Sequence, residues 1–298
     1  MKEFKINNMK NIPINILEGK EVDNMKAIII NVHGIASHFQ KVFYCEDCFE
    51  FRESLFSDFN IKSYALEFHG HGKSEGLKCS IENFDDLVDD LYCLVKYIRK
   101  GDSENKIPIF IIAESMGGAV AIKFNIKYQF ETQIKGYILL APMCGIDDHL
   151  KPNVVLKNIL MTLSNFIPNF KALSTNSKIS NSCKNKKYAE LKKECDFFYH
   201  DKMRLNTARE CYNTSLWINE YGSLFNAPLF LLHGIDDIIT NPQLSINFYN
   251  KVPTKNKAIY LPKNTNHSLL IGIDDDDEHP KIVWEKITSW ITNILEIK

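Results

Sequence analysis

The 298-residue chain has no run of eighteen apolar residues and no apolar core of signal-peptide length near its first residue. A helix that crosses a bilayer needs about 20 such residues, and a secretory signal needs a shorter apolar region. An excess of one charge is also missing, because 36 Lys and Arg stand against 37 Asp and Glu. These absences predict a cytoplasmic protein without membrane spans, and they give no reason to expect a nucleic-acid partner.

The eight cysteines lack the spacing of a metal site or a disulfide scaffold. Cys45 and Cys48 form a single Cys-x-x-Cys pair, whereas a structural zinc site needs a second close pair of ligands. Secreted disulfide scaffolds are shorter and denser in cysteine. We therefore interpret Cys45 and Cys48 as residues at the start of a helix and expect no metal.

Strand and helix patterns alternate along most of the chain. Amphipathic spacing predicts helices at about 44–58, 81–100 and 279–297. Strands alternating with helices predict a mostly parallel sheet covered by helices on both faces, which is an α/β fold. Continuous apolar runs predict its strands at 26–33, 63–68, 107–112, 136–142, 227–234 and 257–262.

Residues 145–225 interrupt this alternation. They contain several amphipathic helical patterns and no clear buried strand. We expect them to form an inserted helical cap over one edge of the sheet, so that residues 1–144 and 226–298 make up the core. From Lys171 to Arg209 there are ten Lys or Arg and four Asp or Glu. Such basic helices could contact an anionic membrane, admit a phosphate-bearing head group, or form a solvated surface.

The stretch from Phe110 to Ala121 joins an apolar strand to an Ala-rich helix through Ser115. Small residues, Ala113 and Gly117, stand two places before and two places after the serine, so that strand and helix can approach closely. A turn of this kind holds the hydroxyl above the sheet, where a histidine can reach it. The alternative is an ordinary turn that contains a serine; we predict that Ser115 is the nucleophile.

Acidic and histidine side chains follow two later strands. Asp236 and Asp237 come after the strand at 227–234, and His267 comes after the last strand. The carboxyl ends of parallel strands meet at one edge of a sheet, and the order Ser, Asp, His is the one found on the α/β-hydrolase fold. Singly, these residues could be loop residues; together with Ser115 they predict a catalytic triad.

The first buried strand ends at His33-Gly34-Ile35. A glycine at this place lets the chain turn tightly and direct the next backbone N–H toward the nucleophile. We predict that the backbone amides of Ile35 and Met116 form the oxyanion hole.

Several stretches resemble the monoacylglycerol lipase and lysophospholipase branch of the α/β-hydrolases. The resemblance extends over nearly the whole chain and rests mainly on residues 33–38, 68–76 and 113–118. It implies the α/β-hydrolase fold, a mobile helical cap over an apolar tunnel, and no cofactor. It also places the acid three residues after Gly234, which selects Asp237 over Asp236.

The same resemblance implies hydrolysis of a small-molecule lipid ester, lysophospholipid or monoacylglycerol, through an acyl-enzyme on Ser115. Ser37 and Lys41 stand where relatives that bind glycerol carry an acidic residue and an arginine, so the head group stays open. A short-chain esterase, a thioesterase, and a catalytically silent ligand-binding relative are the alternatives. Peripheral membrane contact through residues 145–225 is a further expectation.

Overall fold

The computed structural model describes residues 1–40, 48–102, 104, 106–145, 154–173, 185–272, 274 and 277–296. Its centre is an eight-stranded sheet with the strand order β1-β2-β4-β3-β5-β6-β9-β10. The strands are β1 Lys2–Asn7, β2 Pro13–Glu18, β3 Ala27–Val32, β4 Ile61–Glu67, β5 Ile109–Glu114, β6 Gly136–Leu140, β9 Leu229–Leu232 and β10 Lys257–Tyr260.

The sheet is parallel from β4 to β10, and its other edge is an antiparallel hairpin. The parallel strands are those predicted from continuous apolar runs, so the mostly parallel α/β fold is confirmed. The hairpin of β1 and β2 was not predicted. In β1 only Phe4 and Ile6 are partly buried between exposed polar residues, as expected of an edge strand without a continuous apolar run.

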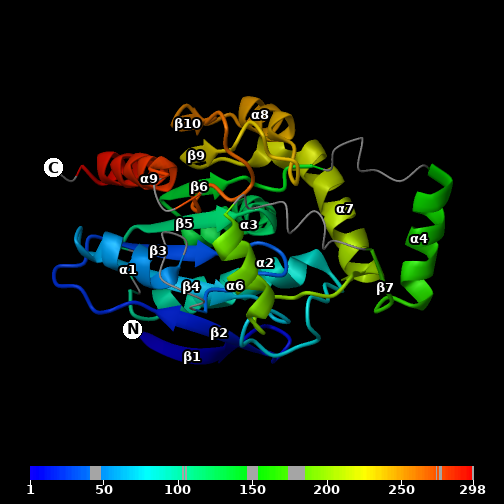
Figure 1. Ribbon diagram of the computed structural model, residues 1–298. Helices are drawn as coiled ribbons and strands as arrows, with labels where there is room; N and C mark the ends of the chain where they lie inside the picture. The colour runs from blue at the N-terminus through cyan, green and yellow to red at the C-terminus, as the bar shows by residue number, and fades with distance from the viewer. Residues whose placement is uncertain are drawn as a thin grey trace.

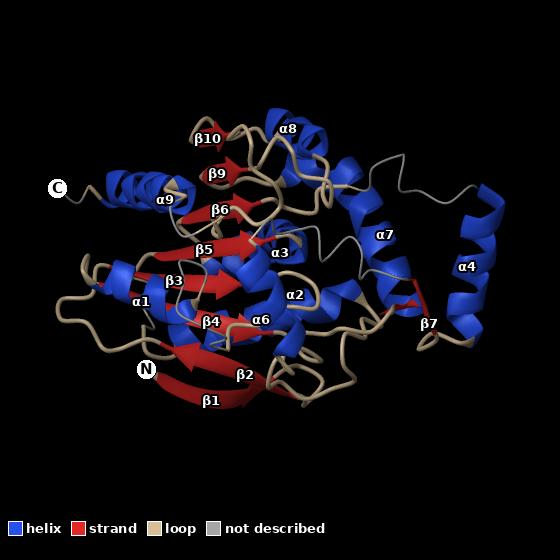
Figure 2. Ribbon diagram, viewed as in Figure 1, coloured by secondary structure: helices blue, strands red, loops and turns tan. Residues whose placement is uncertain are grey.

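Helices cover both faces of the sheet (Figures 1 and 2). Leu91 and Val120 lie in the apolar layer on one face, and Phe56 and Trp284 lie in the layer on the other. The first layer is built by α2, α3 and α8, and the second by α1 and α9. The helix bounds are α1 Phe49–Ser57, α2 Phe84–Arg99, α3 Met116–Thr132, α8 Pro242–Lys251 and α9 His279–Leu295.

Strand β5 shows how one strand contributes to both layers. Ile109 and Ile111 belong to the cluster of α2 and α3, whereas Phe110 and Ile112 belong to the cluster of α1 and α9. Successive side chains of a strand point to opposite faces, so a strand covered on both sides must be apolar throughout. This requirement explains why β5 could be recognised from its sequence.

The segment between β6 and β9 lies at the edge where the parallel strands end (Figure 1). Helix α7 buries Cys211 and Ile218 in the layer of α2 and α3, and α4 lies beyond α7. Strands β7 and β8 pair over so few residues that no sequence pattern marks them. The elements are α4 Val154–Phe166, β7 Lys171–Leu173, α6 Lys186–Glu194, β8 Met203–Arg204, α7 Leu205–Tyr221 and the 3-10 helix η2 Gly222–Leu224.

Within the described part of the chain, no helix is both long and apolar enough to cross a membrane.

Cys48 caps the N-terminus of α1, where its Sγ accepts a hydrogen bond from Phe51 N at 3.4 Å. Cys45 and Lys41 lie outside the described residues.

Candidate active site

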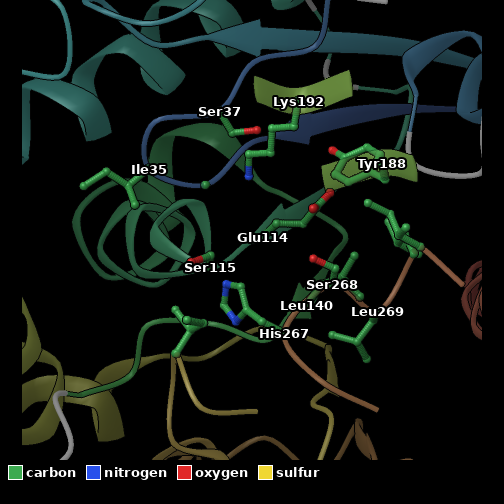
Figure 3. Close-up of a pocket in the computed structure, with 14 residues that line it drawn as sticks. Ile35, Ser37, Glu114, Ser115, Leu140, Tyr188, Lys192, His267, Ser268 and Leu269 are labelled. Carbon is green, nitrogen blue, oxygen red and sulfur yellow. The ribbon is translucent and has the colours of Figure 1, made fainter. Parts of the chain in front are cut away.

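Ser115 lies on a strained turn between β5 and α3. Its backbone has φ 52° and ψ −117°, in a region that residues other than glycine rarely adopt. Backbone hydrogen bonds hold the turn: Ser115 N donates to Leu140 O at 2.9 Å, and Ser115 O accepts from Gly118 N at 3.0 Å. The turn leaves the Ser115 side chain in the wall of a cavity (Figure 3), as a nucleophile elbow requires.

Gly117 lets α3 start directly against β3. A Cβ at this position would lie 2.6 Å from His33 O and 2.9 Å from Val32 O, which is closer than side-chain contacts allow. On the other side of the serine, Ala113 is fully buried, so the sheet accommodates its methyl group where the usual motif has glycine. Alanine in place of glycine at position 113 therefore leaves the turn at Ser115 intact.

The loops after β9 and β10 bring Asp237 and His267 into contact. Asp237 Oδ2 lies 2.7 Å from His267 Nδ1, and Asp237 is buried, whereas Asp236 is exposed. Gly234 makes this possible, because a Cβ on it would lie 2.3 Å from Thr265 O. The backbone before His267 can thus pack against the end of β9, and the structure places Asp237 rather than Asp236 on the imidazole.

The Asp237 carboxylate is surrounded by hydrogen-bond donors. Oδ1 accepts from Ile239 N at 2.7 Å and from Thr240 N at 3.1 Å, and Oδ2 accepts from Thr240 Oγ1 at 2.8 Å. Burial by itself would raise the pKa of Asp237, but the charges and hydrogen bonds of His267 and His233 outweigh it. They hold the pKa well below its usual range, so the carboxylate stays ionised and can orient the imidazole.

His233 is a residue of the site that the sequence analysis missed. It is fully buried, and its Nε2 lies 3.0 Å from Asp237 Oδ2 and 3.1 Å from Thr240 O. Both neighbours are acceptors, so we assign the proton to Nε2, while Nδ1 lies 2.8 Å from Ser245 Oγ. The signal in the sequence was a histidine at the end of a buried strand, four residues before an aspartate.

Ser115 and His267 face the same cavity, and the imidazole is directed toward the serine (Figure 3). Among the described residues, no hydrogen bond joins Ser115 Oγ to His267. In serine hydrolases this bond is often long until substrate binds, so the arrangement is compatible with proton transfer between the two side chains.

The two predicted oxyanion-hole residues also lie at this edge. Ile35 follows β3 and lines the cavity, and Met116 is the first residue of α3. In the described structure neither backbone N–H donates to another protein group. Both amides are therefore available to an oxyanion next to Ser115.

The cavity has a volume of about 110 Å³ and two chemically different walls. Tyr188 and Lys192 reach it from α6, so the segment between β6 and β9 contributes to the site. The apolar wall consists of Leu140, Ile239, Leu269, Leu270 and Ile271. The polar wall consists of Ser37, Glu114, Tyr188, Lys192 and Ser268.

The known proteins to which this chain is similar include an esterase and monoglyceride lipases. Caffeoylshikimate esterase of Arabidopsis thaliana is 25% identical over 236 residues, 79% of this chain and 70% of that protein. A putative monoglyceride lipase of Schizosaccharomyces pombe is 24% identical over 271 residues, 90% of this chain and 68% of that protein. A crystal structure of a soluble variant of monoglyceride lipase from Saccharomyces cerevisiae superposes with a TM-score of 0.80 at 17% identity, covering 98% of this chain and 94% of that one.

The family described as serine aminopeptidase, S33, matches residues 23–274. This range includes Ser115, Asp237 and His267 and extends over more than half of the chain. The chain therefore belongs to the serine aminopeptidase S33 family and is a hydrolase of the α/β-hydrolase fold.

Proposed function

We propose that this chain is a serine carboxylic-ester hydrolase that cleaves single-acyl-chain lipids, monoacylglycerol or lysophospholipid. The observation that carries the proposal is the 2.7 Å contact of buried Asp237 with His267 at the cavity that Ser115 also lines. The relatives that are named as an esterase and as monoglyceride lipases support a carboxylic ester as the bond cleaved.

The reaction proceeds through an acyl-enzyme. Ser115 Oγ attacks the ester carbonyl while His267 Nε2 accepts its proton, and the amides of Ile35 and Met116 stabilise the oxyanion. Asp237 stabilises the imidazolium, which then protonates the departing alcohol. A water molecule activated by His267 hydrolyses the acyl-enzyme and regenerates Ser115. Side chains and backbone amides of the chain, together with one water molecule, carry every step, and no cofactor is needed.

Residues 145–225 act as a cap in this proposal, and residues 1–144 and 226–298 form the core. Tyr188 and Lys192 contribute to the cavity wall from within the segment, which supports this division. A cap over the nucleophile keeps water away from the reacting ester and supplies contacts for the substrate.

The volume of the cavity favours a second candidate, a short-chain esterase. A cavity of about 110 Å³ is small beside the roughly 300–1,000 Å³ that is typical of small-molecule sites. A short acyl group fits this space as it stands, whereas a lipid acyl chain needs more room along the apolar wall.

Acyl-chain length distinguishes the two candidates. Each methylene buried along the apolar wall is worth about 0.8 kcal/mol. We therefore expect kcat/KM to be at least about tenfold higher for an octanoyl ester than for a butanoyl ester. This figure allows for the loss of most of the burial energy to the ordering of the acyl chain. The measurement is a panel of oxygen esters that crosses acyl length with head group, with matched thioesters included. A flat profile would favour the short-chain esterase, and faster thioester hydrolysis would favour a thioesterase.

The cap also presents the surface for peripheral membrane contact. Phe166 at the end of α4 is 78% exposed and Phe170 is 59% exposed, and several other apolar side chains of α4 are exposed as well. Lys186, Lys187 and Lys193 of α6 are exposed too. Apolar and basic side chains on one segment are typical of proteins that bind anionic bilayers.

Two variants test this contact. Phe166→Ser with Phe170→Ser, and separately Lys186→Ser with Lys187→Ser and Lys193→Ser, are each expected to weaken binding to phosphatidylserine-containing vesicles by at least about tenfold. Hydrolysis of a small water-soluble ester should stay unchanged, because none of these residues lines the cavity. Lys184 belongs to the same basic stretch but lies outside the described residues. If vesicle binding were unchanged in both variants, these apolar and basic side chains would form a solvated surface rather than a membrane contact.

A further inference from the structure

A buried carboxylate lies beside the loop that carries one of the predicted oxyanion-hole amides. Glu67 is the last residue of β4 and is fully buried. Strands β3 and β4 are parallel neighbours with Val32 beside Leu66, so the loop that follows β3 begins next to Glu67. We call residues 33–40 the oxyanion loop, because they contain the amide of Ile35.

Four hydrogen-bond donors surround the Glu67 carboxylate. Oε1 accepts from the backbone N of Phe39 at 2.9 Å. Oε2 accepts from Asn15 Nδ2 at 2.9 Å, from Lys73 N at 2.9 Å and from Gln40 Nε2 at 3.2 Å. A carboxylate has about four acceptor sites, so these donors fill it. The group therefore joins β2 and the loop after β4 to the end of the oxyanion loop.

The start of the oxyanion loop is fixed from the same strand end. Burial lowers the pKa of His33 to about 3, so its ring is neutral. Its Nε2 accepts from Phe68 N at 3.2 Å, and we therefore assign the proton to Nδ1, which lies 2.7 Å from Gly34 O. This bond orients the planar peptide between Gly34 and Ile35, and with it the N–H of Ile35.

Between these two ends the oxyanion loop is strained and lies against the nucleophile. Ala36 has a φ of 60°, which residues other than glycine rarely adopt, so the surrounding contacts must hold it in place. A Cβ on Gly34 would lie 3.1 Å from Ser115 Cβ. The Phe39 ring packs edge-on against the His33 ring, with centroids 5.8 Å apart, so the two ends support each other.

We propose that Glu67 is a positioning residue: its hydrogen bond to Phe39 N holds the oxyanion loop where the amide of Ile35 can stabilise the oxyanion. This inference rests on the proposed function, because the oxyanion forms next to Ser115. Glu67 is not among the residues that line the cavity, so it acts through the loop and not on the substrate. A donor stabilises a transition state only when it is held in position before the reaction.

The variant Glu67→Gln separates the bond to Phe39 from the others. Glutamine has the same size but only one acceptor oxygen. Because three donors face Oε2 and one faces Oε1, we expect the amide oxygen to take the place of Oε2 and the NH₂ group to face Phe39 N. For an octanoyl ester kcat should fall by about 10- to 100-fold, with KM within about threefold of wild type.

Asp90→Asn is the matched control. Asp90 of α2 is also fully buried, and it accepts from Asn8 Nδ2 at 2.7 Å and from His69 N at 2.9 Å. The same chemical change at this residue disturbs the loop after β4 but removes no contact of the oxyanion loop. Both variants should lower the thermal unfolding midpoint, whereas kcat of Asp90→Asn should stay within about threefold of wild type.

A pair of organophosphates reports on the oxyanion hole directly. Diethyl 4-nitrophenyl phosphate and its thiophosphate analogue both react by forming a bond from Ser115 Oγ to phosphorus, with loss of 4-nitrophenolate and transfer of the serine proton to His267. The first presents P=O to the oxyanion hole, and the second presents P=S, whose sulfur accepts hydrogen bonds weakly. The ratio of the two rates therefore measures the strength of the oxyanion hole, and intrinsic reactivity cancels when variants are compared.

This ratio should fall by about tenfold in Glu67→Gln and stay at the wild-type value in Asp90→Asn. An unchanged ratio in Glu67→Gln, or the same fall in Asp90→Asn, would overturn the positioning role while leaving the serine hydrolase intact. Absence of reaction between wild type and the phosphate contradicts the proposed function itself.

Gly72→Ala decides the question if Glu67→Gln does not fold. A Cβ on Gly72 would lie 2.4 Å from both carboxylate oxygens of Glu67, so it displaces the carboxylate without changing its chemistry. The same fall in the phosphate-to-thiophosphate ratio is expected, and a wild-type ratio in this variant contradicts the proposal.

Discussion

Replacing Ser115 by alanine is expected to lower kcat for an octanoyl ester by on the order of a millionfold, because the acyl-enzyme can no longer form. The measurement is steady-state hydrolysis of that ester by Ser115→Ala and wild type, together with fluorophosphonate labelling, which should be lost in the variant. Retention of more than a few per cent of the wild-type rate would show that another residue is the nucleophile.

The fold of this variant should be preserved. Ser115 Oγ makes no hydrogen bond to the described residues, and the backbone bonds of the turn do not involve the side chain. Its thermal unfolding midpoint is therefore expected to stay close to that of wild type, since a change of this kind is usually within about 0.5 kcal/mol. A loss of activity without a loss of stability is what separates a catalytic role from a structural one.

The second prediction of large effect concerns the adjacent residues Asp236 and Asp237, whose replacement should change kcat very differently. Asp237→Asn is expected to lower kcat by about four orders of magnitude, because an amide in place of the carboxylate no longer stabilises the correct tautomer and the charged form of His267. Asp236→Asn is the matched control: it makes the same chemical change at the adjacent exposed residue, and its kcat should remain near that of wild type.

Measuring kcat of both variants with the same ester decides which aspartate is the acid of the triad. The reverse ranking would move the acid to Asp236 and contradict the hydrogen bond of 2.7 Å between Asp237 Oδ2 and His267 Nδ1. Equal, small effects would mean that neither carboxylate orients the imidazole.

The parallel part of the sheet was predictable because burial on both faces requires continuous apolar strands. Strand β5 and helix α2 were expected at 107–112 and 81–100 and are observed at Ile109–Glu114 and Phe84–Arg99. Elements in which polar residues interrupt the apolar positions, or which have very few residues, were not found. The β1–β2 hairpin, helix α8, and the short pair of β7 and β8 belong to this group, because their residues alternate with polar ones or are too few to form a pattern.

The sequence by itself determined the order of the elements and the residue types at the ends of the parallel strands. It indicated a serine on an elbow, an acid and a histidine after later strands, and a glycine after the first, because each of these depends on neighbours along the chain. Those local patterns were sufficient to predict the fold and a hydrolytic site.

Only the tertiary structure decided how these residues meet and which further side chains join them. Asp237 meets His267 because the backbone before His267 packs against Gly234, and His233 donates to the same carboxylate from the buried end of β9. Lys192 lines the cavity and Lys193 does not, because successive residues of a helix point in different directions and the position of α6 in the fold sets which of them faces the cavity. The burial and direction of a side chain depend on contacts between segments far apart in sequence, and such contacts leave no pattern among neighbouring residues.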